Sequence, residues 1–259
     1  MRKTFFRLCF ELSSHPVLSS MLQAFTTSKA SRWLIPSFVR VYNINGQEAE
    51  KPLHTYQSLQ EVFTRTLTEN CRPIDLSPKS IVSPVDGVLA EQGTLSDEAN
   101  FVVKNQTYTL EEMLGGKEKA KLYREGTYLL FYLSPSHYHR IHSPVNGTIK
   151  EQWTLGNKSA PVNNLGLRYG KRPLSRNYRL LTELEAEEGR CIVAKIGALN
   201  VNSIVPTHQS EHVDKGEEIG YFAFGSSVML FFEKGTIQLD HQPRAVEVKM
   251  GEKVGSWLR

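Results

Sequence analysis

At 259 residues, with 40% hydrophobic and 22% charged residues, the chain has the composition of a globular protein able to bury a core, which excludes wholesale disorder. Its cysteines, Cys9, Cys71 and Cys191, are widely spaced and form no CxxC pair, which argues against a disulfide framework or cysteine zinc site and indicates a reducing compartment. No apolar run approaches the ~20 residues needed to span a bilayer. Arg7 interrupts the first apolar run without a small-residue cleavage site after it, so no secretory signal is expected.

The basic excess of the chain is concentrated in its first sixth. Residues 1–45 carry six basic residues and one acidic residue, a net charge of +5, whereas the whole chain carries +4. Apolar residues recur here in three groups: Phe5, Phe6, Cys9 and Phe10; Leu18, Met21, Leu22 and Phe25; and Trp33, Leu34 and Phe38. The second group, with Ser14 as a cap and Pro16 in the first turn, predicts an amphipathic helix. Such helices either lie on an anionic bilayer or dock on the core, and both interpretations stay open.

The patterning changes from helical to β-type at about residue 80. Residues 42–53 are polar and indicate a linker, and residues 56–67 predict one more helix, which ends at Arg72-Pro73. Beyond it, short apolar runs separated by Gly, Pro and Asn predict strands over 81–90, 101–103, 127–133, 147–154, 190–198, 219–232, 235–239 and 244–249.

Two segments between these strands have a different texture. Residues 111–123 predict a short helix with a break at Gly115-Gly116, and residues 156–176, rich in Gly, Asn, Lys and Arg, predict a long mobile loop. The whole pattern predicts an α+β fold, with N-terminal amphipathic helices followed by a mostly antiparallel β-sandwich core.

One heptapeptide occurs twice in related form. Ser83-Pro84-Val85-Asp86-Gly87-Val88-Leu89 returns 60 residues later as Ser143-Pro144-Val145-Asn146-Gly147-Thr148-Ile149. In both copies Pro and Asp/Asn-Gly predict a tight turn before an outgoing strand. The repeat suggests two related strand-turn-strand units packed face to face, with Asp86 and the histidines before Ser143 at corresponding strand ends.

Those histidines form the densest cluster of titratable groups. His137, His139 and His142 lie within six positions, out of eight histidines in the chain. In an extended segment His139 points opposite to Tyr138 and His142. The cluster could bind a metal, but no carboxylate or cysteine that would complete the site stands nearby. A role in acid–base catalysis suits histidine better, because its side chain titrates near neutral pH. Histidines in a surface loop are the plainer alternative.

A second unusual stretch interrupts an apolar run near the C-terminus. Residues 220–232 read as a buried strand, yet Gly225-Ser226-Ser227 in its middle weakens a strand interior. A bulged core strand is the plain interpretation. Asp86, His142 and Ser226 together could form a catalytic triad, although spacing alone does not show one. The G-x-S-x-G elbow of a hydrolase is absent.

Several of these segments resemble the motif set of the phosphatidylserine decarboxylase family. The matching segments are Asp86 in Ser-Pro-Val-Asp-Gly, Tyr138-His139-Arg140-Ile141-His142-Ser143-Pro144, Lys215-Gly216-Glu217-Glu218-Ile219-Gly220-Tyr221-Phe222 and Phe224-Gly225-Ser226-Ser227-Val228, with Phe63-Thr64-Arg65 and Arg72-Pro73-Ile74-Asp75 similar to the family's N-terminal signature. The likeness runs in order over residues 55–250. One departure is Phe-Gly-Ser-Ser where the family most often has Leu-Gly-Ser-Thr; the scissile Gly-Ser pair is kept.

The resemblance implies an enzyme that cuts its own chain and makes its own cofactor. His142, held by Asp86, would deprotonate Ser226 so that its Oγ attacks the Gly225 carbonyl, and an N-to-O acyl shift with β-elimination would follow. Ser226 would become a covalent pyruvoyl group that converts phosphatidylserine to phosphatidylethanolamine and CO₂ by Schiff-base chemistry. His139 would be the proton donor, and no metal is implied.

The same resemblance implies an organisation of the chain. Residues 1–54 would be basic membrane-associating helices, and residues 55–259 the catalytic domain, cut into chains 1–225 and 226–259 that remain associated. The expected partners are phosphatidylserine and an anionic membrane surface, at the cytoplasmic face of the cell membrane. No nucleic acid is expected, and a homo-oligomer is left open.

Two other classes of function remain as alternatives. A serine hydrolase would use the same three residues on an external ester, and labelling of an uncleaved Ser226 by a fluorophosphonate would favour it. A carrier module would use Lys215, because the Val213-Asp214-Lys215-Gly216 turn faintly resembles the lysine hairpin of lipoyl and biotinyl domains. A cofactor mass on Lys215 would support that interpretation.

Overall fold

The described part of the N-terminal region, from Pro16 onward, is helical, as predicted. The computed structural model describes residues 16–198, 204–223, 225–240 and 245–258, so Ser14 and the apolar group of residues 5–10 lie outside it. The helices are α2 (Pro16–Thr27), η1 (Lys29–Leu34), α3 (Ile35–Tyr42), η2 (Leu53–Thr55) and α4 (Leu59–Phe63). The predicted helix over 56–67 is therefore shorter; Ser58 caps it by accepting the Glu61 N–H at 3.2 Å. None of the described helices is long and apolar enough to cross a membrane.

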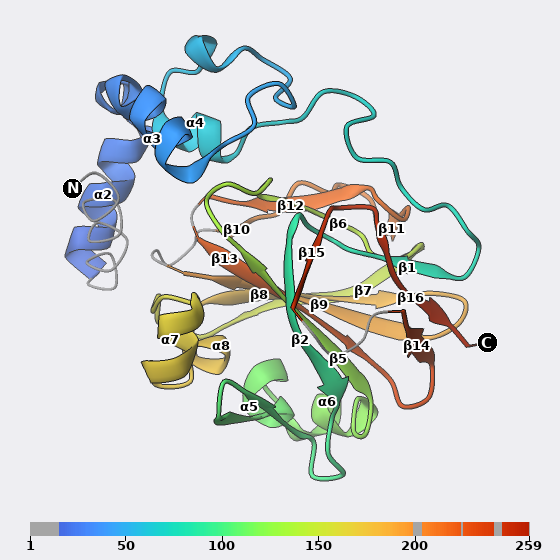
Figure 1. Cartoon of the computed structure of the whole chain (residues 1–259). Coiled ribbons are helices and arrows are strands. Elements are labelled where there is room, and N and C mark those ends of the chain that lie inside the picture. Colours follow the sequence, from blue (N-terminus) through green and yellow to red (C-terminus); the bar gives the residue numbers. More distant parts are fainter. Residues whose placement is uncertain (1–15, 199–203, 224, 241–244, 259) are drawn as a thin grey trace.

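These helices gather at one end of the molecule, above the sheets (Figure 1). Their shared apolar cluster includes Ile35, Phe38, Val62 and Phe63. It takes residues from both sides of the expected boundary at 54/55, so α4 packs with the N-terminal helices while the chain after it enters the sheets.

An eight-stranded antiparallel sheet forms the centre of the protein. Its strands, in spatial order, are β11 (His212–Val213), β7 (Gly147–Leu155), β8 (Arg179–Glu185), β9 (Arg190–Gly197), β13 (Ser226–Phe232), β5 (Thr127–Leu133), β2 (Gly87–Thr94) and β15 (Val246–Val248). Every residue of β13 is buried, because β9 and β5 flank the strand and both faces are covered. The prediction of a mostly antiparallel sandwich is confirmed.

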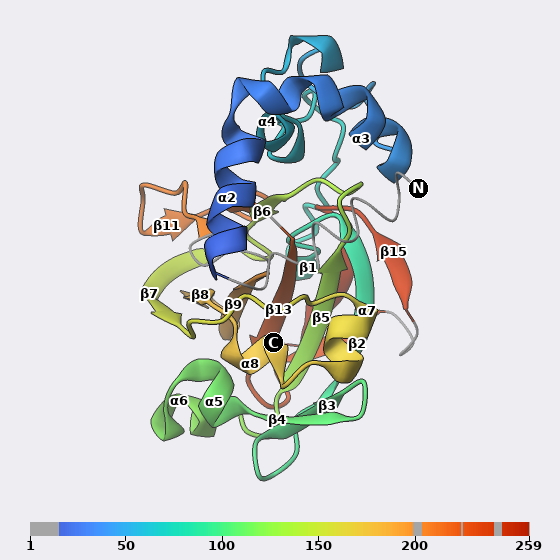
Figure 2. The ribbon, with the colours of Figure 1, turned by 90° about the vertical axis from the view of Figure 1, so that its left-hand side faces the viewer.

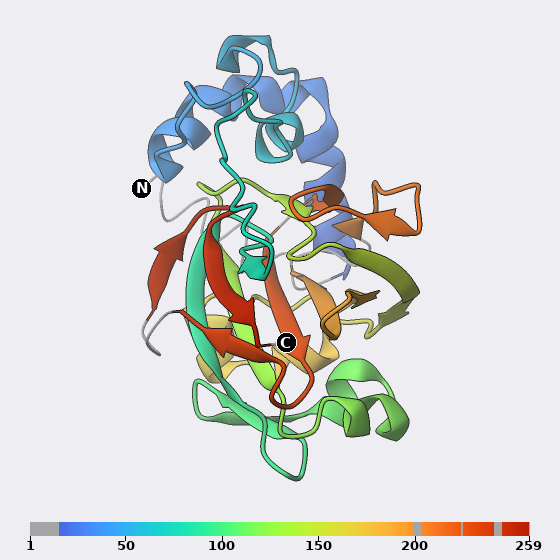
Figure 3. The same ribbon diagram turned by 90° about the vertical axis from the view of Figure 1, so that its right-hand side faces the viewer.

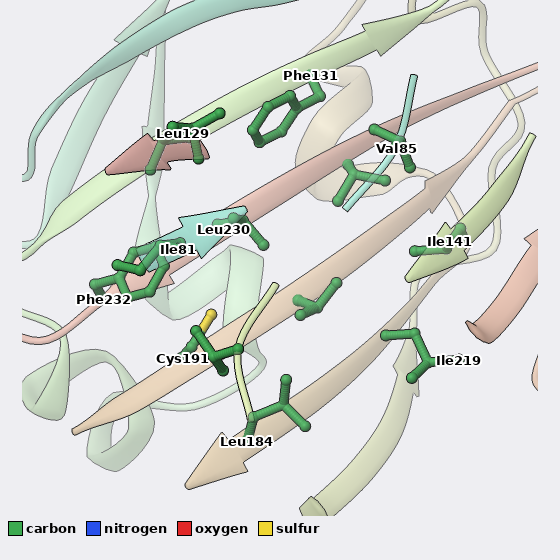
Figure 4. Close-up of a cluster of buried hydrophobic side chains, with 14 of the residues drawn as sticks. Ile81, Val85, Leu129, Phe131, Ile141, Leu184, Cys191, Ile219, Leu230 and Phe232 are labelled. Atoms are coloured by element: carbon green, nitrogen blue, oxygen red, sulfur yellow. The ribbon is translucent and has the colours of Figure 1, made fainter. Parts of the chain in front are cut away.

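Two three-stranded sheets cover one face of the large sheet. One contains β10 (Ile204–Val205), β12 (Glu218–Phe222) and β6 (Arg140–His142); the other contains β1 (Ser80–Val82), β16 (Lys253–Trp257) and β14 (Ile237–Leu239). Figure 4 shows the core between the layers, where Ile141 and Ile219 of a small sheet face Leu184 and Cys191 of the large one. The single strand predicted over 219–232 is wrong, since its two halves, β12 and β13, belong to different sheets.

Short helices and a hairpin cover the opposite face. They are β3 (Asn100–Val103), β4 (Gln106–Thr109), α5 (Leu110–Leu114), α6 (Lys117–Leu122), α7 (Asn164–Tyr169) and α8 (Pro173–Arg176). The predicted break at Gly115-Gly116 separates α5 from α6. The prediction that 156–176 is one long loop is wrong in part, because the segment contains α7 and α8 (Figure 2) and buries Val162, Leu167 and Leu174 against the sheet.

The repeated heptapeptide marks an internal two-fold relationship. Ser83 and Ser143 each donate their hydroxyl to the carbonyl two residues on, Val85 at 2.7 Å and Val145 at 2.6 Å. The turns also bond each other reciprocally: the Val82 N–H donates to Pro144 O at 3.0 Å, and the His142 N–H donates to Pro84 O at 2.8 Å. The two units therefore contact each other at their turns, while their outgoing strands, β2 and β7, both belong to the large sheet, so the predicted face-to-face packing is confirmed only at the turns.

Each turn is completed by a C-terminal partner hairpin. Strand β15 pairs with β2, and β11 pairs with β7, at the corresponding register. Figure 3 shows the red C-terminal strands beside teal β2. In the hairpin turns Gly251 and Gly216 have φ of +87° and +85°, a conformation that glycine adopts without strain, and their N–H groups donate to Ser83 O and Ser143 O.

Candidate active site

Ser226 is the first residue of β13, at the point where the chain enters the large sheet. It lies opposite Leu133 of β5 and Gly197 of β9. By strand alternation its side chain shares a face with Val228, which points into the core between the layers. Ser226 is 1% exposed, and its Oγ is buried without a hydrogen-bond partner in the described part of the chain. A buried hydroxyl left unpaired is costly, and this is a sign of a functional position.

The carbonyl that precedes Ser226 is held in place. Gly225 O accepts the Ala198 N–H at 2.8 Å, which continues the β9–β13 ladder by one step. A main-chain donor on a carbonyl stabilises negative charge that develops on its oxygen. The Gly225–Ser226 bond therefore combines a polarised carbonyl with an adjacent unpartnered hydroxyl.

His142, at the end of β6, is a neutral histidine with both ring nitrogens engaged. Nδ1 lies 2.8 Å from Gly216 O, and Nε2 lies 3.2 Å from the Tyr138 hydroxyl. Because a carbonyl only accepts, Nδ1 carries the proton, and Nε2 is the acceptor that Tyr138 donates to. Burial lowers the pKa of His142 below 6.5, although the Gly216 bond and the charges of Glu218 and Asp86 act in the opposite direction. Near pH 7 its Nε2 is a base.

Asp86 lies in the first turn, and its hydrogen-bond partners differ from the predicted partner, His142. Its carboxylate accepts the Arg72 Nε–H at 2.8 Å, the Arg72 Nη2–H at 2.6 Å and the Met250 N–H at 2.9 Å. Among the described residues His142 takes Gly216 O, rather than Asp86, as the partner of Nδ1. The predicted direct hold of Asp86 on His142 is absent from this geometry, and Asp86 acts on His142 through its charge.

His139 occupies a separate, fully buried environment. Its ring packs on Phe63 of α4 at a centroid distance of 3.7 Å, and its Nδ1 lies 2.9 Å from His137 O. Its Nε2 is buried and has no hydrogen-bond partner among the described residues. The main chain of His139 is fixed beside β12, because its carbonyl accepts the Phe222 N–H at 2.9 Å. Burial, with the charge of Arg65 next, lowers the pKa of His139 well below 6.5.

Sequence reasoning did not identify four groups that shape the site: Tyr138, Arg72, Ala198 and the Gly216 carbonyl. Tyr138 begins the Tyr-His-Arg-Ile-His-Ser-Pro motif and Arg72 begins the Arg-Pro-Ile-Asp motif, and these positions are the signal that could have identified them. The main-chain donor and acceptor have no side-chain signature. The described part of the chain contains no group of three His, Cys, Asp or Glu residues placed to hold a metal.

Lys215 does not suit the carrier interpretation. The residue is buried, and its Nζ donates to Ser77 O at 2.8 Å and to Ser80 Oγ at 2.6 Å. A carrier lysine must extend into solvent, whereas this amine is held inside the protein. The geometry argues against a lipoyl- or biotinyl-type role.

Residues 59–256 match the model of a family described as phosphatidylserine decarboxylase. The chain is 50% identical over 256 residues to the phosphatidylserine decarboxylase proenzyme of Geobacillus sp. (strain WCH70), covering 98% of this chain and 99% of that protein. It is 52% identical over 256 residues to the proenzyme of the same name from Anoxybacillus flavithermus (strain DSM 21510 / WK1), covering 98% and 97%.

These matches define a decarboxylase. The chain belongs to the phosphatidylserine decarboxylase family, as the sequence motifs predicted.

Proposed function

We propose that the protein converts phosphatidylserine to phosphatidylethanolamine and CO₂ after cutting its own chain between Gly225 and Ser226. The relatives' names, which contain both the substrate and the word proenzyme, support this proposal. The observation that carries it is the buried, unpartnered Ser226 Oγ beside a Gly225 carbonyl that already accepts a main-chain N–H.

Cleavage begins with removal of the Ser226 hydroxyl proton. His142 is neutral at pH 7 and presents Nε2 as the base, while Gly216 O holds its Nδ1–H. Tyr138 now donates to that Nε2, so its hydroxyl either yields the position or relays the proton. As the Oγ adds to the Gly225 carbonyl, the Ala198 N–H stabilises the oxygen, and the negative charge of Asp86 favours the protonated His142.

The surroundings of residue 226 fit a covalent pyruvoyl group. Its side chain points into a water-excluding core, and the backbone is fixed by a strand on each side, β9 and β5. Such a group would supply a ketone for the substrate amine and an acceptor for the electron pair that remains as CO₂ leaves. His139 is the proposed proton carrier; because it is neutral at rest, it must first accept a proton at Nε2 before it can donate one.

The two products of cleavage are expected to remain associated. The small chain, residues 226–259, begins with β13, which is bonded along its whole length to β9 and β5 of the large chain. Strands β15 and β16 add pairings with β2 and β1. These ladders bury apolar residues on both faces of the sheet, so separation would expose much of the core.

The N-terminal helices are the proposed contact with an anionic membrane surface, as a peripheral protein of the cytoplasmic face. Met21 of α2 and Trp33 of η1 are 64% and 72% exposed. These large apolar side chains do not pack in the protein core. Exposed Lys29 and Arg40 lie on the same helical segment. Apolar insertion together with basic residues favours an anionic bilayer. Sedimentation with phosphatidylserine-containing and neutral vesicles tests this, with Met21→Ser/Trp33→Ser expected to bind less.

Intact mass spectrometry of the purified protein tests the central proposal. Two fragments, 1–225 and a 226–259 fragment with a ketone at its first residue, are expected, and Ser226→Ala is expected to remain one chain. A fully matured preparation that keeps an ordinary serine at position 226 would contradict the proposal. A fluorophosphonate adduct on an uncleaved Ser226 would favour the serine hydrolase instead.

A further inference from the structure

The buried guanidinium of Arg65 ties the end of α4 to the segment that leads into His139. Its Nη1 donates to Val62 O at 3.2 Å, and its Nη2 donates to Ser136 O at 3.0 Å and to His137 O at 3.4 Å. Arg65 is 5% exposed, and its Nε is buried with no partner in the described part of the chain. Burying an arginine costs desolvation free energy. A buried arginine therefore indicates a position where the planar set of guanidinium N–H donors is needed.

The His137 carbonyl is shared between Arg65 and His139. It accepts an N–H from Arg65 and lies 2.9 Å from His139 Nδ1. A carbonyl cannot donate, so His139 carries its ring proton on Nδ1 and its lone pair on Nε2. Phe63, two residues before Arg65, packs against the same ring. The end of α4 therefore supplies both the surface on which the ring lies and the anchor of the carbonyl that sets its tautomer.

Few charged groups act on the His139 ring. Arg65 after α4 and His137 in the same segment both lower the pKa of His139, after burial, which is the largest cause, and the bond to His137 O acts in the opposite direction. Glu247 of β15 lies against His137 Nε2 at 3.3 Å rather than against His139. From β12 the contact is the Phe222 main chain. The ring is therefore neutral at rest and sensitive to the charge at position 65.

We propose that Arg65 is a positioning residue that, through the His137 carbonyl, fixes His139 with Nε2 as the nitrogen that carries the proton in decarboxylation. The inference rests on the proposed function and deepens it. The substrate ammonium loses one proton to Nε2, which gives an imidazolium. After CO₂ leaves, the same nitrogen returns that proton to the substrate α-carbon, and the ring is neutral again. The water released when the Schiff base forms is taken up again when it is hydrolysed. Protons and charge then balance for CO₂ and a neutral amine, which gains its ammonium proton from solvent.

The tautomer is measured in the Ser226→Ala background, which does not depend on turnover. Ring ¹⁵N shifts assigned by comparison with His139→Gln are expected to show Nδ1–H alone. Adding Arg65→Gln is expected to give a mixture of tautomers, because the anchored carbonyl is released. Unchanged shifts in this double variant would overturn the proposal.

Turnover is measured in the Arg65 variants with Ser226 in place. Both Arg65→Gln and Arg65→Lys are expected to cleave within a few-fold of the unaltered protein and to lose about 10- to 100-fold in kcat. Because loss of the positive charge raises the pKa of His139, and the resting ring must be neutral, the acid limb of kcat/KM moves to higher pH in Arg65→Gln. Lysine keeps the charge without the planar fork, so Arg65→Lys keeps the acid limb while kcat falls. An acid limb in Arg65→Gln identical to that of the unaltered protein would refute the role.

Arg179 provides a matched control for the structural cost. It is also a buried arginine on carbonyls, those of Met113 at 2.9 Å and Ser175 at 2.7 Å among them, in the α5 and α8 region. Arg179→Gln is expected to lower stability without moving the His139 tautomer or the acid limb; a shift of both in this variant would overturn the proposal by making the effect non-specific. Unimpaired turnover in His139→Gln would instead refute the proposed function of His139. The ¹⁵N shifts would still test whether Arg65 sets the tautomer of that ring.

Discussion

The two heptapeptide turns have nearly the same hydrogen bonds and different chemical capacities. In the first turn Asp86 Oδ1 accepts the Met250 N–H at 2.9 Å; in the second Asn146 Oδ1 accepts the Lys215 N–H at 2.7 Å. The Ser83 N–H donates to Glu252 O, and the Ser143 N–H to Glu217 O, both at 2.8 Å. The turns thus serve one structural purpose, which either an aspartate or an asparagine fulfils.

The chemistry arises where the symmetry is broken. Val82 occupies the position before the first turn and His142 the corresponding position before the second, and each donates its N–H across to the other turn. The charged Asp86 belongs to the turn whose Pro84 carbonyl accepts the His142 N–H. Its charge favours protonated His142, and its carboxylate also holds Arg72. Exchanging residues between corresponding positions separates the shared scaffold from the site that was built on it.

The largest effect is expected when His142 is replaced by valine, the residue at the corresponding position 82. Strand β6 and the bond to Pro84 O remain available, while the base is lost. Self-cleavage is expected to slow by at least about 10²- to 10⁴-fold, measured as the intact 259-residue chain in mass spectra over time. Normal processing in His142→Val would remove His142 from the site.

The same replacement has a signature in the pH dependence of stability. The folded-state pKa of His142 is lowered from 6.5, so below that pH the unfolded chain binds a proton that the folded one does not. Stability is therefore lost as pH falls below 6.5, by up to about 1.4 kcal/mol per pH unit for one such group. In the Ser226→Ala background, urea midpoints at pH 7.0 and 5.5 are expected to differ less once His142 is valine. An equal difference would show that His142 is not the titrating group.

Asp86→Asn, which copies the second turn into the first, is expected to rank next. Asparagine still accepts the Met250 N–H, but Arg72 loses its buried ion-pair partner; the two side chains are 7% and 8% exposed. Unfolding free energy is expected to fall by about 3–5 kcal/mol, and cleavage to slow by about a hundredfold. Glu48→Gln, at the more exposed partner of Arg72, is the control. An equal loss of cleavage there would assign the effect to the placement of Arg72.

These same residues show which parts of the fold and of the site can be predicted from the sequence. The strand over 127–133 and the helix beginning at Pro16 follow from local periodicity, and the heptapeptide repeat identified the paired turns. The partners of the site residues did not follow, because Gly216 O and Ala198 N are main-chain groups and Arg72 reaches Asp86 from an irregular segment. The helices of segment 156–176 did not follow from the sequence, because its apolar residues have no regular period, although Val162, Leu167 and Leu174 are buried.

Lys215→Met makes the second hairpin turn match the first, where Met250 stands. The amine would no longer donate to Ser77 O and Ser80 Oγ, so unfolding free energy is expected to fall by about 1–3 kcal/mol. Denaturant unfolding in the Ser226→Ala background measures this. Lys249→Met, an exposed lysine beside the other hairpin turn, is the control and is expected to change stability by less than about 0.5 kcal/mol. Equal effects of both replacements would deny Lys215 a structural role.

Asn146→Asp is expected to have the smallest effect and gives the sharpest test of the comparison. Position 146 is exposed, and an aspartate accepts the Lys215 N–H as well as an asparagine does, so stability is expected to change by less than about 0.5 kcal/mol. Across the pair of turns, this turn bonds Val82, whose N–H donates to Pro144 O. The side chain of Val82 cannot act as an acid or a base. Asn146→Asp therefore should not restore cleavage to Asp86→Asn, as followed by fragment appearance on a denaturing gel. Restoration would mean that any carboxylate in either turn suffices, and that the charge of Asp86 acts at long range rather than from its place beside Arg72.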